Sequence, residues 1–247
     1  MKIKYADHHK WVKNIPLDDV LGSFGDSNKE KLKSTLNKIN EANITSIIEP
    51  VDNAFLEWFV PLYTDNIVKK DNPKIYPIRE KVFNVDKQYL ALKLYENELP
   101  IGATIFTYNG EFVSVAYRSY LNNWQEARLR ANPSLYTEYL LEQHTRELNY
   151  KKILHGRDRN PYGANASIGL AIFKLSIGCQ PYLSKSYELL ELDTESCSKD
   201  VFVLEYPGNT KDVITKGYLI TSKDTFNKWL PVTKYQHLVE IEVIYKD

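Results

Sequence analysis

Cysteine is scarce in this sequence, which argues against a fold held by disulfides. Only Cys179 and Cys197 are present in 247 residues, too few for a disulfide framework in a chain of this length. Their spacing is not typical of metal ligands, and the adjacent His8 and His9 would diverge on either a strand or a helix. We therefore expect a cytoplasmic protein without a metal site.

Long apolar runs and net charge are also missing. No window approaches the roughly 20 apolar residues that span a bilayer, and residues 1–10 lack the apolar core of a signal peptide. The 32 basic and 32 acidic residues cancel, so no overall field attracts the chain to nucleic acid or to an anionic membrane. We expect no membrane span, and charge does not indicate tRNA as a partner, although it stays possible.

Internal repeats and low-complexity tracts are absent as well, which favours one folding unit with an appendage. We predict an N-terminal extension over residues 1–43, packed on a main domain over residues 44–247. Ile3 and Tyr5 form a short apolar opening. Apolar residues at helical spacing then predict a surface helix over residues 26–43.

The main domain is predicted to begin with a strand followed by two helices. An apolar run over residues 44–51 is typical of a strand, and Asp52 is a suitable cap for an aromatic-rich helix over residues 53–70. We interpret the aromatic stripe of this helix as core packing rather than a ligand site. A further helix is predicted over residues 77–83.

The periodicity then changes from helical to alternating. Leu90, Leu92 and Leu94 alternate with other residues, and residues 101–108 and 111–120 continue the alternation. The Asn109-Gly110 dipeptide is a strong hairpin signal and predicts the two positive backbone torsions of a type I′ turn. The result is a predicted antiparallel meander of three strands.

Helices and strands alternate after the meander. Pro133 can open a helix at its first position, and a short strand is predicted over residues 153–155. A helix over residues 167–177 is apolar almost all round, as expected for a helix buried against a sheet. A polar, turn-rich segment over residues 157–165 lies between them. Further strands are predicted at residues 187–192, 201–206, 217–221 and 238–245, with a short helix at 225–230.

This order of elements resembles the GNAT superfamily of acyltransferases. At residue level the segment Tyr95-Glu-Asn-Glu-Leu-Pro-Ile-Gly-Ala-Thr-Ile-Phe resembles two adjacent strands of that superfamily. The start of a helix at Asn-Pro-Ser-Leu-Tyr (132–136), and the positions Phe173, Lys174 and Gly178, are similar to the branch that contains the Fem-type aminoacyltransferases. The resemblance covers roughly residues 44–206 and implies an α/β (α+β) fold: a GNAT-like mixed sheet with an antiparallel three-strand meander and helices on both faces.

Two departures from the superfamily bear on the acyl donor. Most acetyl-CoA enzymes of the superfamily hold the pyrophosphate in a glycine-rich loop, whereas residues 125–132 contain no glycine, and Phe173 occupies the region of a tyrosine that protonates the leaving thiolate. The Fem-like branch tends to lack the glycine loop, and some of its members take the acyl group from aminoacyl-tRNA. The departures therefore fit that branch.

The resemblance implies an enzyme that transfers an acyl group to an amine by direct attack. Such a transfer needs an acyl-binding sheet, a proton acceptor and a group that stabilises the leaving group, but no covalent nucleophile. We expect a primary amine of a small molecule, an amino sugar or a peptide as acceptor. No permanently bound cofactor is expected, and acyl-CoA is possible as co-substrate.

The densest polar cluster, residues 155–165, follows a predicted strand and is the first candidate for the site. One interpretation takes Asp158 or His155 as proton acceptor, Arg157 as an anion clamp and Tyr162 as a donor or positioning group, with Asn160 contacting substrate. The alternative is a hydrogen-bonded connection in which Asp158 pairs with a neighbouring arginine, Arg157 or Arg159, and Asn165 caps the next helix.

Further candidates lie outside this cluster. Guanidinium groups can replace an amide loop as phosphate ligands, so Arg128 and Arg130 are candidates for cofactor binding together with Asn132 and Lys174. The alternatives are a solvated helix face for the arginines and an internal carboxylate partner for the buried lysine. Tyr117 and Arg118 line the acceptor cleft in one interpretation; in the other they are ordinary strand residues.

Three functions stay open at the sequence level. They are an N-acyltransferase with acyl-CoA as donor, a Fem-like aminoacyltransferase that uses aminoacyl-tRNA, and a non-catalytic binding protein that keeps the fold. No feature of the sequence indicates an oligomeric state.

Overall fold

The computed structural model describes residues 1–16, 19, 21–70, 73–83, 86–121 and 133–246. The chain forms two compact units: one contains residues 14–154, and the other contains residues 1–13 together with residues 155–247. The predicted limits, 1–43 and 44–247, lie elsewhere and stay a prediction. None of the helices in the described ranges is long and apolar enough to cross a membrane.

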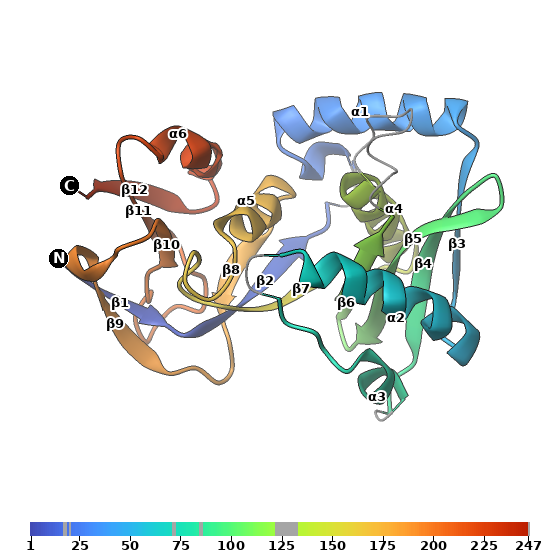
Figure 1. Cartoon of the computed structure of the whole chain (residues 1–247), viewed down its shortest axis with the longest axis horizontal. Coiled ribbons are helices and arrows are strands. Elements are labelled where there is room, and N and C mark those ends of the chain that lie inside the picture. Colours follow the sequence, from blue (N-terminus) through green and yellow to red (C-terminus); the bar gives the residue numbers. More distant parts are fainter. Residues whose placement is uncertain (17–18, 20, 71–72, 84–85, 122–132, 247) are drawn as a thin grey trace. The chain divides into compact units, whose positions relative to one another are not determined.

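The unit of residues 14–154 follows the predicted order of elements closely (Figure 1). Its sheet has the strand order β3-β4-β5-β6-β7. Its elements are α1 (Asp26–Glu41), β3 (Ile44–Pro50), α2 (Asn53–Val68), α3 (Ile78–Phe83), β4 (Tyr89–Glu96), β5 (Leu99–Asn109), β6 (Phe112–Tyr120), α4 (Pro133–Glu147) and the first residues of β7 (Lys152–Arg159).

The three-strand meander is confirmed, but its two hairpins differ from the prediction. β4, β5 and β6 pair in antiparallel fashion. Asn109 pairs with Phe112, so Gly110 is the first central residue of that turn, and among the two central residues it alone has a positive φ, 59°; this matches a type II′ turn. The type I′ pattern of two positive φ angles occurs instead at Asn97 and Glu98, between β4 and β5.

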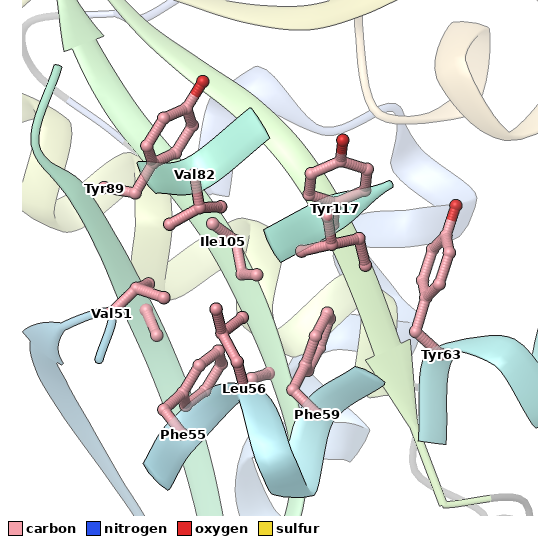
Figure 2. Close-up of a cluster of buried hydrophobic side chains, with 12 residues drawn as sticks. Val51, Phe55, Leu56, Phe59, Tyr63, Val82, Tyr89, Ile105 and Tyr117 are labelled. Carbon is pink, nitrogen blue, oxygen red and sulfur yellow. The ribbon is translucent and has the colours of Figure 1, made fainter. Parts of the chain in front are cut away.

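Helices cover both faces of this sheet, as predicted. Side chains of α2 and α3 pack against one face of β4, β5 and β6, where Ala91, Ile105 and Tyr117 lie (Figure 2). Residues of α1 and α4 pack against the opposite face, which presents Leu94 and Phe106. The aromatic stripe of α2 is part of this core, in agreement with its interpretation as packing.

The unit that joins both ends of the chain is rich in short strands. Its elements are β1 (Lys2–Ala6), β2 (His8–Asn14), the remainder of β7, α5 (Ile168–Ser176), β8 (Gln180–Leu183), β9 (Leu189–Asp193), β10 (Val201–Leu204), β11 (Lys216–Thr221), α6 (Phe226–Trp229) and β12 (Glu240–Tyr245). β1 pairs with β9 and β2 with β8, both antiparallel. β11 lies between β10 and β12, antiparallel to the first and parallel to the second.

Two local predictions need correction in this unit. β7 continues to Arg159, so the segment expected to be a loop from residue 157 begins as a strand. The predicted apolar helix is α5, which is buried on one side and exposes Gly169 and Leu170 on the other. Its cap is Ser167, whose hydroxyl accepts from the Gly169 amide at 3.1 Å, whereas the predicted cap, Asn165, donates to the Asn160 carbonyl.

Candidate active site

The carboxylate of Asp158 is the centre of a polar cluster inside the unit of residues 1–13 and 155–247. Asp158 lies near the end of β7, after Gly156, whose φ of 82° suits glycine. Its Oδ2 atom accepts three hydrogen bonds: from Trp11 Nε1 at 2.9 Å, from Tyr162 Oη at 2.9 Å and from Lys174 Nζ at 2.7 Å. We call these four residues and His9 the Asp158 cluster.

Lys174 reaches this carboxylate from the buried side of α5. Ile168, Ala171 and Lys174 follow one another at helical spacing and all are buried. The Lys174 ammonium lies 5.8 Å from the centre of the Trp11 ring, where the negative face of the indole adds a cation–π attraction. Of the two alternatives left by the sequence, a phosphate of a substrate or an internal carboxylate, the structure has the internal carboxylate.

The Tyr162 hydroxyl has a single proton, and this fixes which group donates in each of its hydrogen bonds. That proton is donated to Asp158, so the hydrogen bond of 2.7 Å between His9 Nε2 and Tyr162 Oη must use the imidazole proton. Trp11 Nε1 also donates to Tyr162 Oη at 2.8 Å. His9 is therefore assigned as the Nε2–H tautomer.

Burial fixes the charge states of the two innermost residues. It lowers the pKa of His9 to about 3, although the Asp158 carboxylate opposes this shift. It also raises the pKa of the Tyr162 hydroxyl well above its usual range, and the Asp158 charge acts in the same direction. Both side chains are neutral near pH 7, which leaves Asp158 and Lys174 as the ion pair of the cluster.

Other predicted members of the 155–165 segment lie apart from this hydrogen-bonded centre. His155 is buried on β7. Arg157 is exposed and donates to the Ser186 carbonyl at 3.3 Å, which differs from the predicted pairing with Asp158. The Asn160 amide donates to the carbonyls of Ala6 and Leu204 and accepts from the Leu204 amide, which accounts for this side chain without a substrate.

The loop after β7 is anchored through its backbone. Tyr162 and Phe202 exchange two hydrogen bonds, of 2.8 and 3.0 Å. At the next residue, Gly163, φ is 94° and a Cβ atom would lie 2.2 Å from the Asp200 carbonyl oxygen. Only glycine allows so close an approach, so Gly163 fixes the loop that carries Tyr162.

The remaining predicted site residues belong to the other unit or are not described. Tyr117 and Arg118 are neighbours on β6 but face opposite sides of the sheet: Tyr117 contacts the α2 side, and Arg118 forms an ion pair of 2.9 Å with the buried Glu138 of α4. That Tyr117 and Arg118 both line the acceptor cleft stays a prediction. The three other candidates for cofactor binding, Arg128, Arg130 and Asn132, lie outside the described residues.

Sequence reasoning missed two members of the Asp158 cluster, His9 and Trp11. Both lie on β2, two residues apart, and therefore on the same face. The adjacent His8, on the opposite face, bonds to Asp7. Only His9, Lys10 and Trp11 alternate between buried and less buried positions, and the buried Val12 and Lys13 break the pattern, so the local signal for a half-buried strand is weak.

Comparisons with known proteins give a fold. No protein-family model matches the sequence, and no curated protein matches it. Among solved structures, "Crystal structure of FemX" aligns with a TM-score of 0.52 and 13% identity over 70% of this chain. The chain has a Fem-like fold. Because the identity is so low, the likeness carries no substrate or residue role with it.

Two other solved structures align less well. "The structure of L-PGS from Bacillus licheniformis" has a TM-score of 0.45 with 13% identity over 63% of this chain. A conserved protein of unknown function from Bacteroides thetaiotaomicron VPI-5482 has 0.47 with 14% identity over 77%. The chain spans 59% of the FemX chain, 46% of the L-PGS chain and 61% of the Bacteroides chain.

Proposed function

We propose that this protein is an N-acyltransferase that transfers an acyl group to the primary amine of a small molecule, an amino sugar or a peptide, with Asp158 as the proton acceptor. The observation that carries the proposal is the geometry of this carboxylate. Three donors hold Oδ2, while Oδ1 makes no hydrogen bond within the described part of the chain. With 11% of the Asp158 side chain exposed, Oδ1 is the oxygen left for an incoming amine.

The chemistry proposed for the site needs no covalent intermediate. The amine nitrogen attacks the acyl carbonyl and forms the new C–N bond. The bond to the leaving thiolate or alkoxide breaks, and the amine proton passes to Asp158 Oδ1. Lys174 compensates the carboxylate charge, and Trp11 and Tyr162 fix its orientation, so that the acceptor is held in place before substrate arrives.

The donor in this proposal is acyl-CoA, used as a co-substrate without any permanently bound cofactor. Arg128, Arg130 and Asn132 are the residues proposed to bind its phosphates, because guanidinium groups bind phosphate in bidentate fashion. Lys174 is no longer proposed for this role, since its ammonium is paired with Asp158. It acts instead through the carboxylate, as a positioning residue.

Aminoacyl-tRNA is the second candidate donor. The observations that favour it are the similarity of the fold to FemX and the absence of glycine from residues 125–132. The formal net charge of zero provides no general attraction for RNA, so this candidate needs a local binding surface. The two candidate donors are different ligands, so a binding measurement on the same chain distinguishes them.

Thermal stabilisation distinguishes the donors, because a ligand that binds only the folded state raises the apparent stability. Acetyl-CoA, longer acyl-CoAs and a mixture of charged tRNAs are added separately to the full chain. A shift with acyl-CoA alone supports the first donor, and a shift with charged tRNA alone supports the second. If neither ligand shifts the melting temperature and no amine is acylated, a non-catalytic binding protein replaces both.

The role of Asp158 is tested with the donor that binds and a panel of amines, with the acylated product measured by mass spectrometry. Loss of a general base typically lowers the rate about 10² to 10⁴-fold, and we expect this for Asp158→Asn. Asp65→Asn, at an exposed aspartate on α2, is the matched control and should keep the wild-type rate. A folded Asp158→Asn protein with an undiminished rate would rule out Asp158 as proton acceptor.

A further inference from the structure

Two buried hydroxyl oxygens on β6, Ser114 Oγ and Tyr117 Oη, have no hydrogen-bond partner among the described residues. Ser114 lies opposite Thr107, and Tyr117 opposite Ile105. Residues 105 and 107 share a face of β5, so the two hydroxyl-bearing side chains lie on one face of the sheet. Buried polar groups nearly always have a partner, and this pair has none in the part of the chain that the structure describes.

Two further phenols belong to the same face. Tyr89 and Tyr63 pack in the core cluster that contains Tyr117, and the Tyr63 ring meets the Tyr117 ring edge-on with centroids 5.6 Å apart. Figure 2 shows the phenol oxygens of Tyr63, Tyr89 and Tyr117 pointing to the same side. We call Tyr63, Tyr89, Ser114 and Tyr117 the hydroxyl cluster.

The charge beside the hydroxyl cluster is positive. The Lys81 ammonium lies 5.2 Å from the centre of the Tyr117 ring. Tyr76, whose ring centre is 6.5 Å from that of Tyr117, has the Lys74 ammonium 5.1 Å from its own centre. A cationic ligand would be repelled here, whereas an anion would be attracted.

The phenols of the cluster are hydrogen-bond donors at any physiological pH. Burial raises the pKa of Tyr63 and of Tyr117 to about 12, so both hydroxyls keep their protons. Neutral donors next to ammonium groups are the arrangement that recognises carboxylate or phosphate oxygens. Tyr76, 44% exposed, is the exposed ring beside the buried Tyr117 ring.

We propose that the hydroxyl cluster binds a small organic anion, a carboxylate or a phosphate attached to an apolar body. In this site Ser114 Oγ and Tyr117 Oη donate to the anionic oxygens, and Lys81 offsets the charge. The rings of Tyr63 and Tyr76 contact the apolar body. Binding here does not depend on the proposed acyl transfer, so the two proposals succeed or fail separately.

Titration calorimetry of the full chain with three probes tests the charge requirement. Benzoate and benzamide have nearly the same shape and differ in charge, and phenyl phosphate supplies the second anion. We expect benzoate or phenyl phosphate to bind at least tenfold more tightly than benzamide, and the tighter of the two identifies the preferred anion. If both bind no better than benzamide, or if nothing binds, the proposal is wrong.

Two variants test whether the hydroxyl groups donate to the ligand, with the anion that binds more tightly as the probe. Tyr117→Phe and Ser114→Ala are each expected to weaken binding about tenfold, because each removes a hydrogen bond to a charged group. Tyr187→Phe, in the other unit, is the matched control and should bind normally.

The melting temperature separates ligand binding from a structural role. Because Tyr117 Oη has no partner in the described chain, Tyr117→Phe should melt at the same temperature as the wild type or higher. Unchanged affinity, or weaker binding accompanied by a lower melting temperature, would overturn the assignment.

Discussion

His9 couples the stability of the Asp158 cluster to pH. Its pKa is about 3 in the folded protein, lowered by burial from its ordinary value of 6.5, so the unfolded chain takes up a proton at higher pH than the folded one. Stability is therefore present above pH 6.5 and is lost as the pH falls from 6.5 towards 3. At about 1.4 kcal/mol per pKa unit, the loss reaches roughly 3 kcal/mol by pH 4.

We expect His9→Gln to remove this dependence. The variant should lose stability at pH 7, because it disturbs the bond to Tyr162, but the difference from wild type should shrink by roughly 3 kcal/mol between pH 7 and pH 4. Urea unfolding at several pH values measures it. His237→Gln, at an exposed histidine, is the control, and a constant difference for His9→Gln would contradict the buried neutral imidazole.

Gly163 is the residue at which a single methyl group should be least tolerated. Its Cβ would lie 2.2 Å from the Asp200 carbonyl oxygen, whereas a Cβ at Gly208, with a similar positive φ of 87°, would meet nothing within 4 Å. Gly208→Ala should cost about 1 to 2 kcal/mol from backbone strain alone. Gly163→Ala adds the clash and should cost about 1 to 3 kcal/mol more.

Urea denaturation of the two glycine variants measures that difference. Equal losses would mean that the loop moves away from Asp200 without cost, and the anchoring role assigned to Gly163 would then be wrong. The position matters for the site, because the next residue towards the N-terminus is Tyr162, a donor to Asp158.

At the scale of single elements, α2 owes part of its stability to its cap. The Asp52 carboxylate accepts a hydrogen bond of 2.7 Å from the Phe55 amide, which satisfies a donor that the helix itself leaves free. We expect Asp52→Ala to lower the free energy of unfolding by about 1 kcal/mol. Asp65→Ala, which removes only an exposed ion pair with Lys69, should cost less than about 0.5 kcal/mol. Equal losses in denaturant would contradict the capping role.

The elements that could be predicted are those whose periodicity is carried by apolar side chains. Leu90, Leu92 and Leu94 alternate cleanly, and β4 was predicted within one or two residues of its ends. In β1 only two apolar residues, Ile3 and Tyr5, mark the buried face, and in β2 the buried positions include His9 and Lys13, so apolar side chains do not mark that face. Such segments gain their order from pairing with β9 and β8, which a local pattern does not contain.

The candidate site was predictable only in part, because its contacts also join segments that lie far apart in the sequence. The sequence predicts Asp158, Tyr162 and Lys174 as site residues, because polar residues are expected at the end of a strand and a lysine stands out on an apolar helix. Their mutual hydrogen bonds, and those of His9 and Trp11, join residues separated by up to 153 positions. Such separations follow from topology, since no local spacing encodes them.

At the scale of the whole molecule, the chain forms two units. One is the continuous segment of residues 14–154, and the other combines the segments that precede and follow it in the sequence, residues 1–13 and 155–247. The core clusters that contain α2 and α4 lie entirely within residues 14–154. A continuous segment with its own buried core is able to fold alone. We expect a fragment of residues 14–154 to unfold cooperatively in urea.

A fragment of residues 155–247 alone should not unfold cooperatively in urea. Without residues 1–13, β9 loses its partner β1, and β8 loses β2. Asp158 also loses the Trp11 donor. Joining residues 1–13 to the end of residues 155–247 through a Gly/Ser linker should restore cooperative unfolding, because both termini belong to this unit (Figure 1).

Circular dichroism and urea titration of the three fragments test this division. If residues 155–247 unfold cooperatively without the N-terminal strands, β1 and β2 are not needed to hold the Asp158 cluster together. If the linked fragment stays unfolded while residues 14–154 fold, the unit that carries the cluster depends on the rest of the chain. That dependence would make the Asp158 site a property of the intact molecule.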